Sequence, residues 1–448
     1  MKLKSQIIFL LFFFFSVQLF SQQLRTEYLT FDAAIAYAVH HAPDLIVKRL
    51  LTQQQQEQLL ETRLDALPDI YATSDLRRNL IIPTTPIPAH MIDPSAPGDE
   101  MMYMRFNTPW SSATGLNLSY DLFNPQQYGK TSEQKKELNI SKIEAEIAEN
   151  DIRAAVAQAY IDCVISGAQL QSIVVDTLYY AQLMVETEKQ FQLGKISQAE
   201  KNQIEINYNT VQTRFLDAKS IYNDSKINLL LLIGVQIDNN VLSRLSLSED
   251  IETLYRKLIE NHVFEEIPSL TYSKLTEQLS LSQLKTRNTK LQYLPSFTLS
   301  GFYGANYFGQ KLHLTQTNRW FGNSFLALSL HIPIVQSLST SKVVSQLRIQ
   351  EMIDQENIRA FQNEQSSKIS GELARFDHLI QNYKIKQKTN KLWNENLMAR
   401  SAEKDKGYIL ESDFWNEKLQ AQNAFQEYLQ AAYELLSAYI RIEKLMKE

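Results

Sequence analysis

The chain is almost free of cysteine: Cys163 is the only one among 448 residues. One cysteine excludes an internal disulfide, and its distance from the N-terminus excludes a lipid-anchoring signal. The sequence also lacks a basic cluster or tail, and its net charge is −5, so we expect no nucleic-acid partner. It contains no glycine-rich phosphate loop, no His/Cys cluster with metal-ligand spacing and no nucleophile elbow. We therefore expect neither an enzyme nor a bound cofactor or metal.

Proline is missing from two long tracts, residues 126–267 and 334–448. Helix interiors exclude proline because its ring removes a hydrogen-bond donor and clashes with the preceding turn. Both tracts are therefore predicted to be long helices that continue through Gly167 and Gly371. The stretch before the first predicted turn, about 68 residues, corresponds to a helix of roughly 100 Å, which requires a special architecture.

Each tract contains one predicted turn. In FQLGKISQAE (191–200), Gly194 is suited to end a helix, and Ser197 with Glu200 matches a capping box that starts the next one. In EKDKGYILESDF (403–414), Gly407 is the predicted stop and Ser412 is a candidate cap. The two tracts are therefore predicted to form two long helical hairpins with tips at these glycines.

A heptad pattern of apolar and small residues predicts that the paired helices pack as a coiled coil. Alanine and serine in the pattern indicate close approach of the helices, and Cys163 is interpreted as one of its small packing residues. In the first hairpin, the pattern comprises Ile152, Val156, Ala159, Cys163, Ser166, Leu170 and Ile173, followed by Val211, Phe215, Ala218, Tyr222, Ser225, Leu229 and Leu232.

Alternating segments predict four strands, each about as long as a transmembrane β-strand. Leu116, Leu118 and Tyr120 fall on one face, for example, while Asn117 and Ser119 fall on the other. The same alternation fits lipid-facing strands with a polar lumen or a half-buried sheet of a soluble protein. The proline-rich link 81–112 and the link 309–322 are predicted to be loops. The four strands are predicted at about 70–80, 113–124, 296–308 and 324–333.

The N-terminus predicts a secretory signal at 1–21, with Lys2 and Lys4 before an apolar core and Ser21 at its end. Loss of these two lysines would change the net charge from −5 to −7. A membrane anchor is the alternative, but the apolar run is short for a span. No later stretch is apolar for long enough to be a transmembrane helix, so an exported chain of this kind is soluble or an outer-membrane barrel.

The order of elements repeats, with helix, strand, strand and helical hairpin in each half. APDLIVKRLL (42–51) is similar to IPSLTYSKLT (267–276), and LDALPDIYATSDL (64–76) is similar to LQYLPSFTLSGFY (291–303). The expected organisation is a first repeat at 22–234, a polar equatorial linker at 235–266 and a second repeat at 267–448. The linker is interpreted as a surface elaboration beside the helices. Single-chain barrels start at eight strands, so four strands would need several copies of the chain to close a barrel.

This order resembles the TolC-like outer-membrane efflux proteins over nearly all of the mature chain, from LTFDAAIAYAVHHAPDL (29–45) to AYELLSAYIRIEKL (432–445). The resemblance implies a mainly α fold with a β-barrel portion, built as a homotrimer with a twelve-stranded barrel and a twelve-helix periplasmic tunnel. It also implies an outer-membrane location and a passive exit duct for substrates from an inner-membrane efflux transporter and a periplasmic membrane-fusion adaptor. Outer-membrane lipid would surround the barrel.

The resemblance also implies two sets of functional residues. The hairpin tips would meet the adaptor, and Leu410 departs from the small hydroxyl residue that the family has three positions after the glycine. Asp413 and Asn416 would line the tunnel constriction, where three copies of Asp413 would attract cations; the alternative is an ordinary acid in the first turn of a helix. The tip contacts are Leu193, Gly194, Lys195 and Ser197, and Lys406, Gly407 and Tyr408.

A second function is consistent with the residues alone: a periplasmic coiled-coil scaffold or adaptor with a small soluble sheet and no membrane barrel. Trp110 and Trp320 are candidates for an interfacial aromatic girdle, with scattered loop aromatics as the alternative. His40 and His41 are interpreted as helix-end residues, because consecutive helical residues face different ways. The cargo and the class of pump do not follow from the sequence.

Overall fold

The computed structural model describes residues 28–99, 101–260, 264, 268–334, 336–409 and 411–448. The predicted signal at 1–21 therefore lies outside the described residues. The chain divides into two compact units, one formed by residues 50–143 and 273–360 and the other by the remaining residues. They are called the sheet unit and the hairpin unit below. No helix in the described ranges contains an apolar stretch long enough to cross a membrane.

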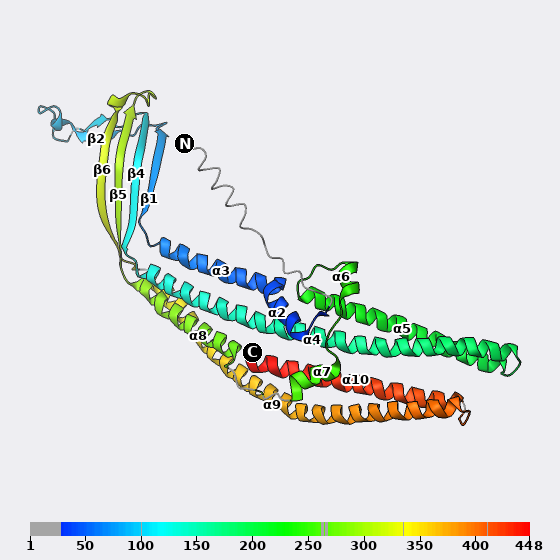
Figure 1. Ribbon diagram of the computed structural model, residues 1–448. Helices are drawn as coiled ribbons and strands as arrows, with labels where there is room; N and C mark the ends of the chain where they lie inside the picture. Colours follow the sequence, from blue (N-terminus) through cyan, green and yellow to red (C-terminus); the bar gives the residue numbers. More distant parts are fainter. Residues whose placement is uncertain (1–27, 100, 261–263, 265–267, 335, 410) are drawn as a thin grey trace, which may run out of the picture. The chain divides into compact units, whose positions relative to one another are not determined.

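The sheet unit contains an antiparallel sheet in the order β1–β4–β5–β6 (Figure 1). Its central pair joins the two halves of the chain, because β4 precedes the first hairpin and β5 belongs to the second repeat. In the described part of the chain, β1 and β6 pair with one neighbour each, so the sheet has two open edges. The strands are β1 (Asp69–Arg78), β4 (Trp110–Phe123), β5 (Ser296–Gly309) and β6 (Trp320–His331).

The register gives the sheet one apolar and one more polar face. Leu118 is opposite Ile70 on β1 and Gly301 on β5, and Gly301 is opposite Leu326 on β6. On the other face, Asn117 donates a hydrogen bond from Nδ2 to Thr73 Oγ1 (2.8 Å), and Thr298 donates one from Oγ1 to Asp121 Oδ1 (2.8 Å). The leucines of β6 are more than half exposed, so the apolar face lacks a covering layer among the described residues.

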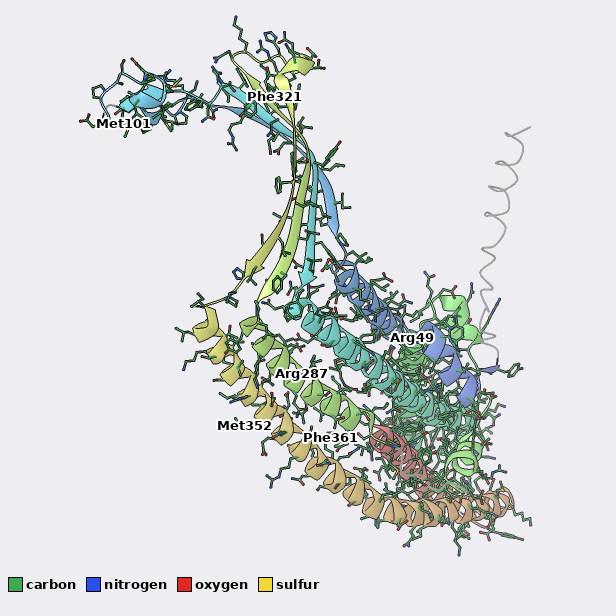
Figure 2. All side chains as sticks on the ribbon, turned by 90° about the vertical axis from the view of Figure 1, so that its left-hand side faces the viewer. Arg49, Met101, Arg287, Phe321, Met352 and Phe361 are labelled. Atoms are coloured by element: carbon green, nitrogen blue, oxygen red, sulfur yellow. The ribbon has the colours of Figure 1, made fainter. Side chains whose placement is uncertain are left out.

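Two of the predicted loops contain more structure than expected. A short hairpin pairs β2 (Thr85–Pro88) with β3 (Met101–Met104), and a 3₁₀ turn, Ala89–Met91, follows β2. The prediction that 81–112 is entirely loop is therefore wrong. In a two-stranded hairpin both strands are edges, so a proline can place its missing donor on the unpaired side. Figure 2 shows this hairpin, marked by Met101, beyond the end of the sheet.

The second loop is shorter than expected because the strands extend farther. Trp110 pairs with Arg78 and Gly309, and Trp320 pairs with Tyr307, so β4 and β6 begin at these tryptophans. A 3₁₀ turn, Thr317–Arg319, comes directly before β6. The Trp320 indole donates from Nε1 to the Leu314 carbonyl (2.9 Å), which fixes the loop against the strand end.

Polar contacts hold the helical segments of the sheet unit together. The Asn288 amide donates to the Gly129 carbonyl (2.9 Å), and a Cβ at Gly129 would lie 2.9 Å from the Asn288 side chain. Lys136 pairs with Glu277 at 2.7 Å. The absence of a side chain at Gly129 therefore lets the two helices approach closely, and the hydrogen bond and the ion pair join them. The segments belong to α3 (Pro43–Leu64), α4 (Pro125–Gln192), α8 (Leu270–Thr289) and α9 (Gln336–Asp405).

In the hairpin unit, α4 pairs with α5 (Gln198–Leu232) and α9 pairs with α10 (Glu411–Lys447) (Figure 1). The α4 helix has 68 residues and continues through Gly167, where the Tyr222 ring of α5 occupies the space that a side chain would fill. Val156, Cys163, Val211 and Leu229 of the predicted heptad pattern are buried, which confirms the packing of this hairpin. Burial raises the pKa of the Cys163 thiol to about 12, as expected for a packing residue.

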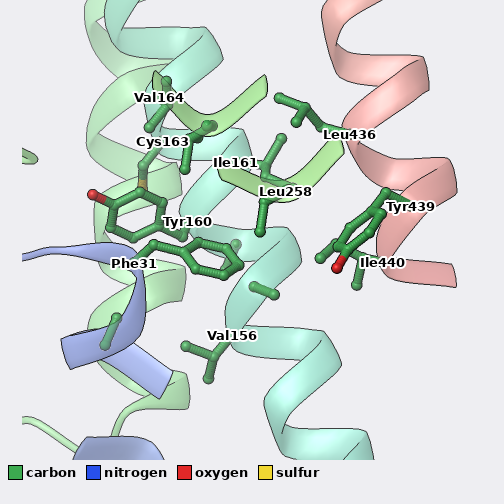
Figure 3. Close-up of a cluster of buried hydrophobic side chains, with 14 of the residues drawn as sticks. Phe31, Val156, Tyr160, Ile161, Cys163, Val164, Leu258, Leu436, Tyr439 and Ile440 are labelled. Carbon is green, nitrogen blue, oxygen red and sulfur yellow. The ribbon is translucent and has the colours of Figure 1, made fainter. Parts of the chain in front are cut away.

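The core of this unit also includes the N-terminal helix α2 (Phe31–His41) and the segment that joins the repeats. Figure 3 shows Phe31 against Tyr160, with Leu258 and Tyr439 in the same cluster. His41 ends α2, and its ring stacks on Tyr37 (centroids 3.9 Å apart).

The prediction that 235–266 is a surface elaboration is wrong for its apolar residues. This segment forms α6 (Asn239–Arg244), α7 (Ile251–Tyr255) and a π-helical turn, Arg256–Glu260. Several apolar residues of this segment are buried in the core, while most of the polar residues between them stay exposed. The buried residues are Leu245, Ile251, Leu254, Leu258 and Ile259. The Glu249 carboxylate accepts hydrogen bonds from the Phe31 amide (2.5 Å) and the Tyr160 hydroxyl (2.8 Å), which ties the segment to α2 and α4.

Candidate functional site

The first hairpin tip is a tight turn built around a glycine. Gly194 has φ of 69°, in the left-handed region that a side chain disfavours. Its amide donates to the Phe191 carbonyl, and the Lys195 amide donates to the Gln190 carbonyl, both at 2.9 Å. This pattern is a Schellman motif, which satisfies the last carbonyls of α4.

The helix after this tip begins with the predicted capping box. The Glu200 amide donates to Ser197 Oγ (3.2 Å), and the Ser197 amide donates to Glu200 Oε2 (2.7 Å). The hydrogen bonds from the Ser197 backbone and hydroxyl lower the pKa of Glu200. Lys201 pairs with Glu188 at 2.7 Å and lies over the Phe191 ring, so the first turn of α5 is fastened to the last turns of α4.

The predicted residues of this tip lie together on its surface. Leu193 is 69% exposed, and Gly194, Lys195 and Ser197 are also exposed. An apolar side chain this exposed at a hairpin end is a candidate contact for another protein.

The second tip has the same backbone geometry. Gly407 has φ of 76°, its amide donates to the Lys404 carbonyl, and the Tyr408 amide donates to the Glu403 carbonyl, both at 2.9 Å. Lys406 is exposed, and Tyr408 is 76% exposed. Ser412 lies inside α10, which begins at Glu411, so the prediction that it caps this helix is wrong. A capping residue precedes the first helical residue, so the helix begins earlier and the turn after Gly407 is shorter than predicted.

Asp413 and Asn416 are three residues apart on α10, and both are exposed. Phe414, between them in sequence, is buried, so the two polar residues share the outward face of the first turns of α10. Both side chains are therefore free to contact solvent or another molecule.

A groove of about 500 Å³ lies beside the first tip. Its walls come from α4, α5 and α10, which brings both hairpins to one surface. Tyr180 and Trp415 meet edge to face with ring centroids 4.8 Å apart, and the carboxylates of Glu186 and Glu200 are also part of the lining.

A buried ion pair next to this groove was not predicted. Lys418 Nζ of α10 lies 3.0 Å from Asp176 Oδ1 of α4, and the two side chains are 9% and 10% exposed. The ammonium also lies 3.7 Å from the centroid of the Tyr179 ring, and the Gln422 amide donates to the Asp176 carboxylate. Nothing in the sequence near Asp176 or near Lys418 indicates that the two residues pair, because they belong to different repeats of the chain.

In the described ranges, no group of three His, Cys, Asp or Glu side chains is arranged to hold a metal ion. The candidate functional features are therefore the two tips, the outward face of α10 and the open sheet with its exposed leucines.

The fold is that of solved outer-membrane channels. The Campylobacter jejuni CmeC outer membrane channel matches with a TM-score of 0.71 and 15% identity over 93% of this chain and 85% of that one. The open state of the Neisseria gonorrhoeae MtrE outer membrane channel matches with a TM-score of 0.69 and 14% identity over 93% of this chain and 88% of that one. The outer membrane protein VceC from Vibrio cholerae matches with a TM-score of 0.64 and 14% identity over 93% of this chain and 94% of that one.

Neither a family model nor a curated protein matches the sequence. At these identities the structural similarity establishes the fold, and it confirms at that level the predicted resemblance to TolC-like proteins. It also confirms a mainly helical chain with four principal strands and long paired helices.

Proposed function

We propose that the chain is a subunit of an outer-membrane channel that serves as the exit duct of an efflux or secretion system. Three copies would place their four-stranded sheets edge to edge as a twelve-stranded barrel, and their hairpins would form a helical tunnel in the periplasm. The fold of CmeC, MtrE and VceC, which are outer-membrane proteins, supports this function.

The open sheet is the observation that carries the proposal. Membrane-spanning sheets must close, because an unpaired backbone group in hydrocarbon costs several kcal/mol. Here β1 and β6 are open edges among the described strands, and one face presents exposed leucines, including Leu326 and Leu328. Pairing of β6 with β1 of a second copy would satisfy the edges, and lipid would cover the leucines.

We propose that the two tips dock on a periplasmic adaptor that connects the channel to an inner-membrane transporter. Two exposed side chains, Leu193 and Tyr408, would supply apolar contact area, and Lys195 and Lys406 would supply charge. The matching backbone turns at Gly194 and Gly407 support an equivalent role for both tips. Ser197 would stabilise the first tip through its capping box.

We propose that Asp413 and Asn416 line the constriction of the tunnel. Their common exposed face near the second tip supports this position. Three carboxylates around one axis would attract cations. The transport step itself would be passive, with energy supplied by the transporter.

Membrane fractionation and planar-bilayer recording test the proposal together. The protein should remain in the outer-membrane fraction after a high-salt wash, and the purified chain should produce discrete conductance steps. A chain released by salt that makes no conductance steps would instead be a periplasmic scaffold, which would overturn the proposal.

A further inference from the structure

The more polar face of the sheet carries an unexpected line of aromatic residues. The register places Tyr71, Asn117, Phe302 and Phe325 next to one another across β1, β4, β5 and β6. This set is called the aromatic row. The same face carries Thr73, Ser119, Ser300 and Ser329 on other rows, so the row is an apolar band within a polar surface.

Two glycines hold one ring of the row in a defined position. Gly115 and Gly304 face each other across β4 and β5. A Cβ added to Gly115 would lie 2.8 Å from Phe302 Cζ, and one added to Gly304 would lie 2.9 Å from the same atom. The Phe302 ring therefore lies over the glycine pair, where an added side chain would meet both this ring and the backbone of the neighbouring strand.

The neighbouring ring is stacked on the first and remains accessible. Phe302 and Phe325 have ring centroids 6.2 Å apart and an interplanar angle of 25°. Phe325 is 53% exposed, so one of its aromatic faces is available to a ligand.

A second pair of rings extends the aromatic surface toward the loops. Phe308 and Phe321 have centroids 6.2 Å apart, and register places both on the same face as the aromatic row. Figure 2 marks Phe321 near the loop end of the sheet.

The charges on this face favour a cationic ligand. Its carboxylates are Asp69 and Asp75 on β1 and Asp121 on β4, and the cationic side chain among its strand residues is Arg77. His331 of β6 lies at the opposite end of the sheet from Arg77. Asp121 already accepts hydrogen bonds from Thr298 and Asn124. Asp75 on β1 shares a row of the register with Phe321, which lies on the other edge strand, β6.

We propose that the aromatic row and the Phe308–Phe321 pair form a binding surface for aromatic organic cations in the lumen of the barrel. The inference rests on the proposed channel function, which places this face toward the lumen. Barrel lumens are mainly polar, so stacked phenylalanines there present apolar area to water unless a ligand covers them. Aromatic faces attract cations, and an aromatic cation can also stack on the exposed rings.

Block of single channels by tetraphenylphosphonium tests the inference, with tetraethylammonium as a cation that has no aromatic ring. Phe325→Ala should raise the half-blocking concentration of tetraphenylphosphonium roughly two- to fivefold, as loss of an exposed cation–aromatic contact predicts. Phe325→Leu retains apolar area and should give a smaller increase. Block by tetraethylammonium, which can make a cation–aromatic contact but cannot stack a ring on Phe325, should change less than block by tetraphenylphosphonium in both variants.

Leu326→Ala is the matched control, because Leu326 neighbours Phe325 and lies on the opposite face. Unchanged tetraphenylphosphonium block in Phe325→Ala, or an equal effect of Leu326→Ala, would overturn the inference while leaving the channel in place. If Phe325→Ala does not assemble, Phe321→Ala and equilibrium dialysis of tetraphenylphosphonium against the purified protein give the same comparison. A wild-type chain that makes no pores would instead contradict the proposed function, and the inference with it.

Discussion

The Asp176 carboxylate of α4 and the Lys418 ammonium of α10, 3.0 Å apart and nearly buried, join the two repeats inside the hairpin unit. The contact links helices that are more than two hundred residues apart in the chain. A buried pair of this kind depends on both partners, because loss of one leaves the other charge without compensation.

Asp176→Asn should therefore destabilise the hairpin unit by about 3–5 kcal/mol, since Lys418 would remain buried with a neutral partner. Thermal unfolding followed by circular dichroism measures the loss as a lower Tm. The double variant Asp176→Leu with Lys418→Met removes both charges and should be more stable than Asp176→Asn.

Glu364→Gln provides the control for an exposed pair. Lys368 and Glu364 are 2.6 Å apart on α9, but their side chains are 55% and 63% exposed. Solvent screens such a pair, so the change should lower the Tm much less than Asp176→Asn does. Equal effects at both sites would contradict the assignment of Asp176–Lys418 as a buried structural contact.

Alanine at two glycines should have opposite effects on stability. Gly194 has positive φ and open space where a side chain would lie, so Gly194→Ala should cost about 1–2 kcal/mol through the backbone alone. Gly371 is within α9, also with open space around it, so Gly371→Ala should stabilise by about 0.5–1 kcal/mol. The Tm of each variant checks the signs, and a loss at Gly371 would show that this position has an unrecognised packing role.

Stability should fall in acid partly through Glu149. Burial raises the pKa of this carboxyl, but hydrogen bonds and charges from Arg153 and Arg49 outweigh burial and lower the pKa overall. Because the folded-state pKa is lowered, the contribution is present above the unfolded pKa of about 4.3 and is lost as pH falls through the folded value. Glu149→Gln should therefore lose less stability than wild type in this window, as measured by urea unfolding at several pH values. Parallel pH profiles for the two proteins would rule out this contribution.

Asp413→Ala should weaken cation block of the channel if three copies of this carboxylate surround the tunnel axis. Divalent-cation titration of single-channel conductance measures the change, with Asp377→Ala on α9 as an exposed control of the same charge. If the two variants respond alike, Asp413 is an ordinary helix residue and not part of a constriction.

The long helices could be predicted because proline exclusion and heptad spacing are local properties of the backbone. Gly194, Ser197 and Glu200 likewise encode the first tip in adjacent residues, and the structure has the predicted turn and capping box. The prediction of the second tip was less accurate, because Ser412 is a residue type that often caps helices but lies inside α10.

The missed features depend on residues brought together only by folding. Asp176 and Lys418 belong to different repeats, and the Phe302–Phe325 stack requires the register of β5 against β6. The β2–β3 hairpin was missed for a different reason, since Pro86 and Pro88 argue against strand except at an unpaired edge. Alternation of apolar and polar residues in a strand is the same whether the apolar face meets lipid or a protein core. That the apolar face meets lipid is therefore part of the proposed function.

Single-particle images of the detergent-purified protein test the central claim most directly. The proposal predicts a closed particle with threefold symmetry, in which β6 of each copy pairs with β1 of the next. Monomeric particles, or rings without threefold symmetry, would contradict it.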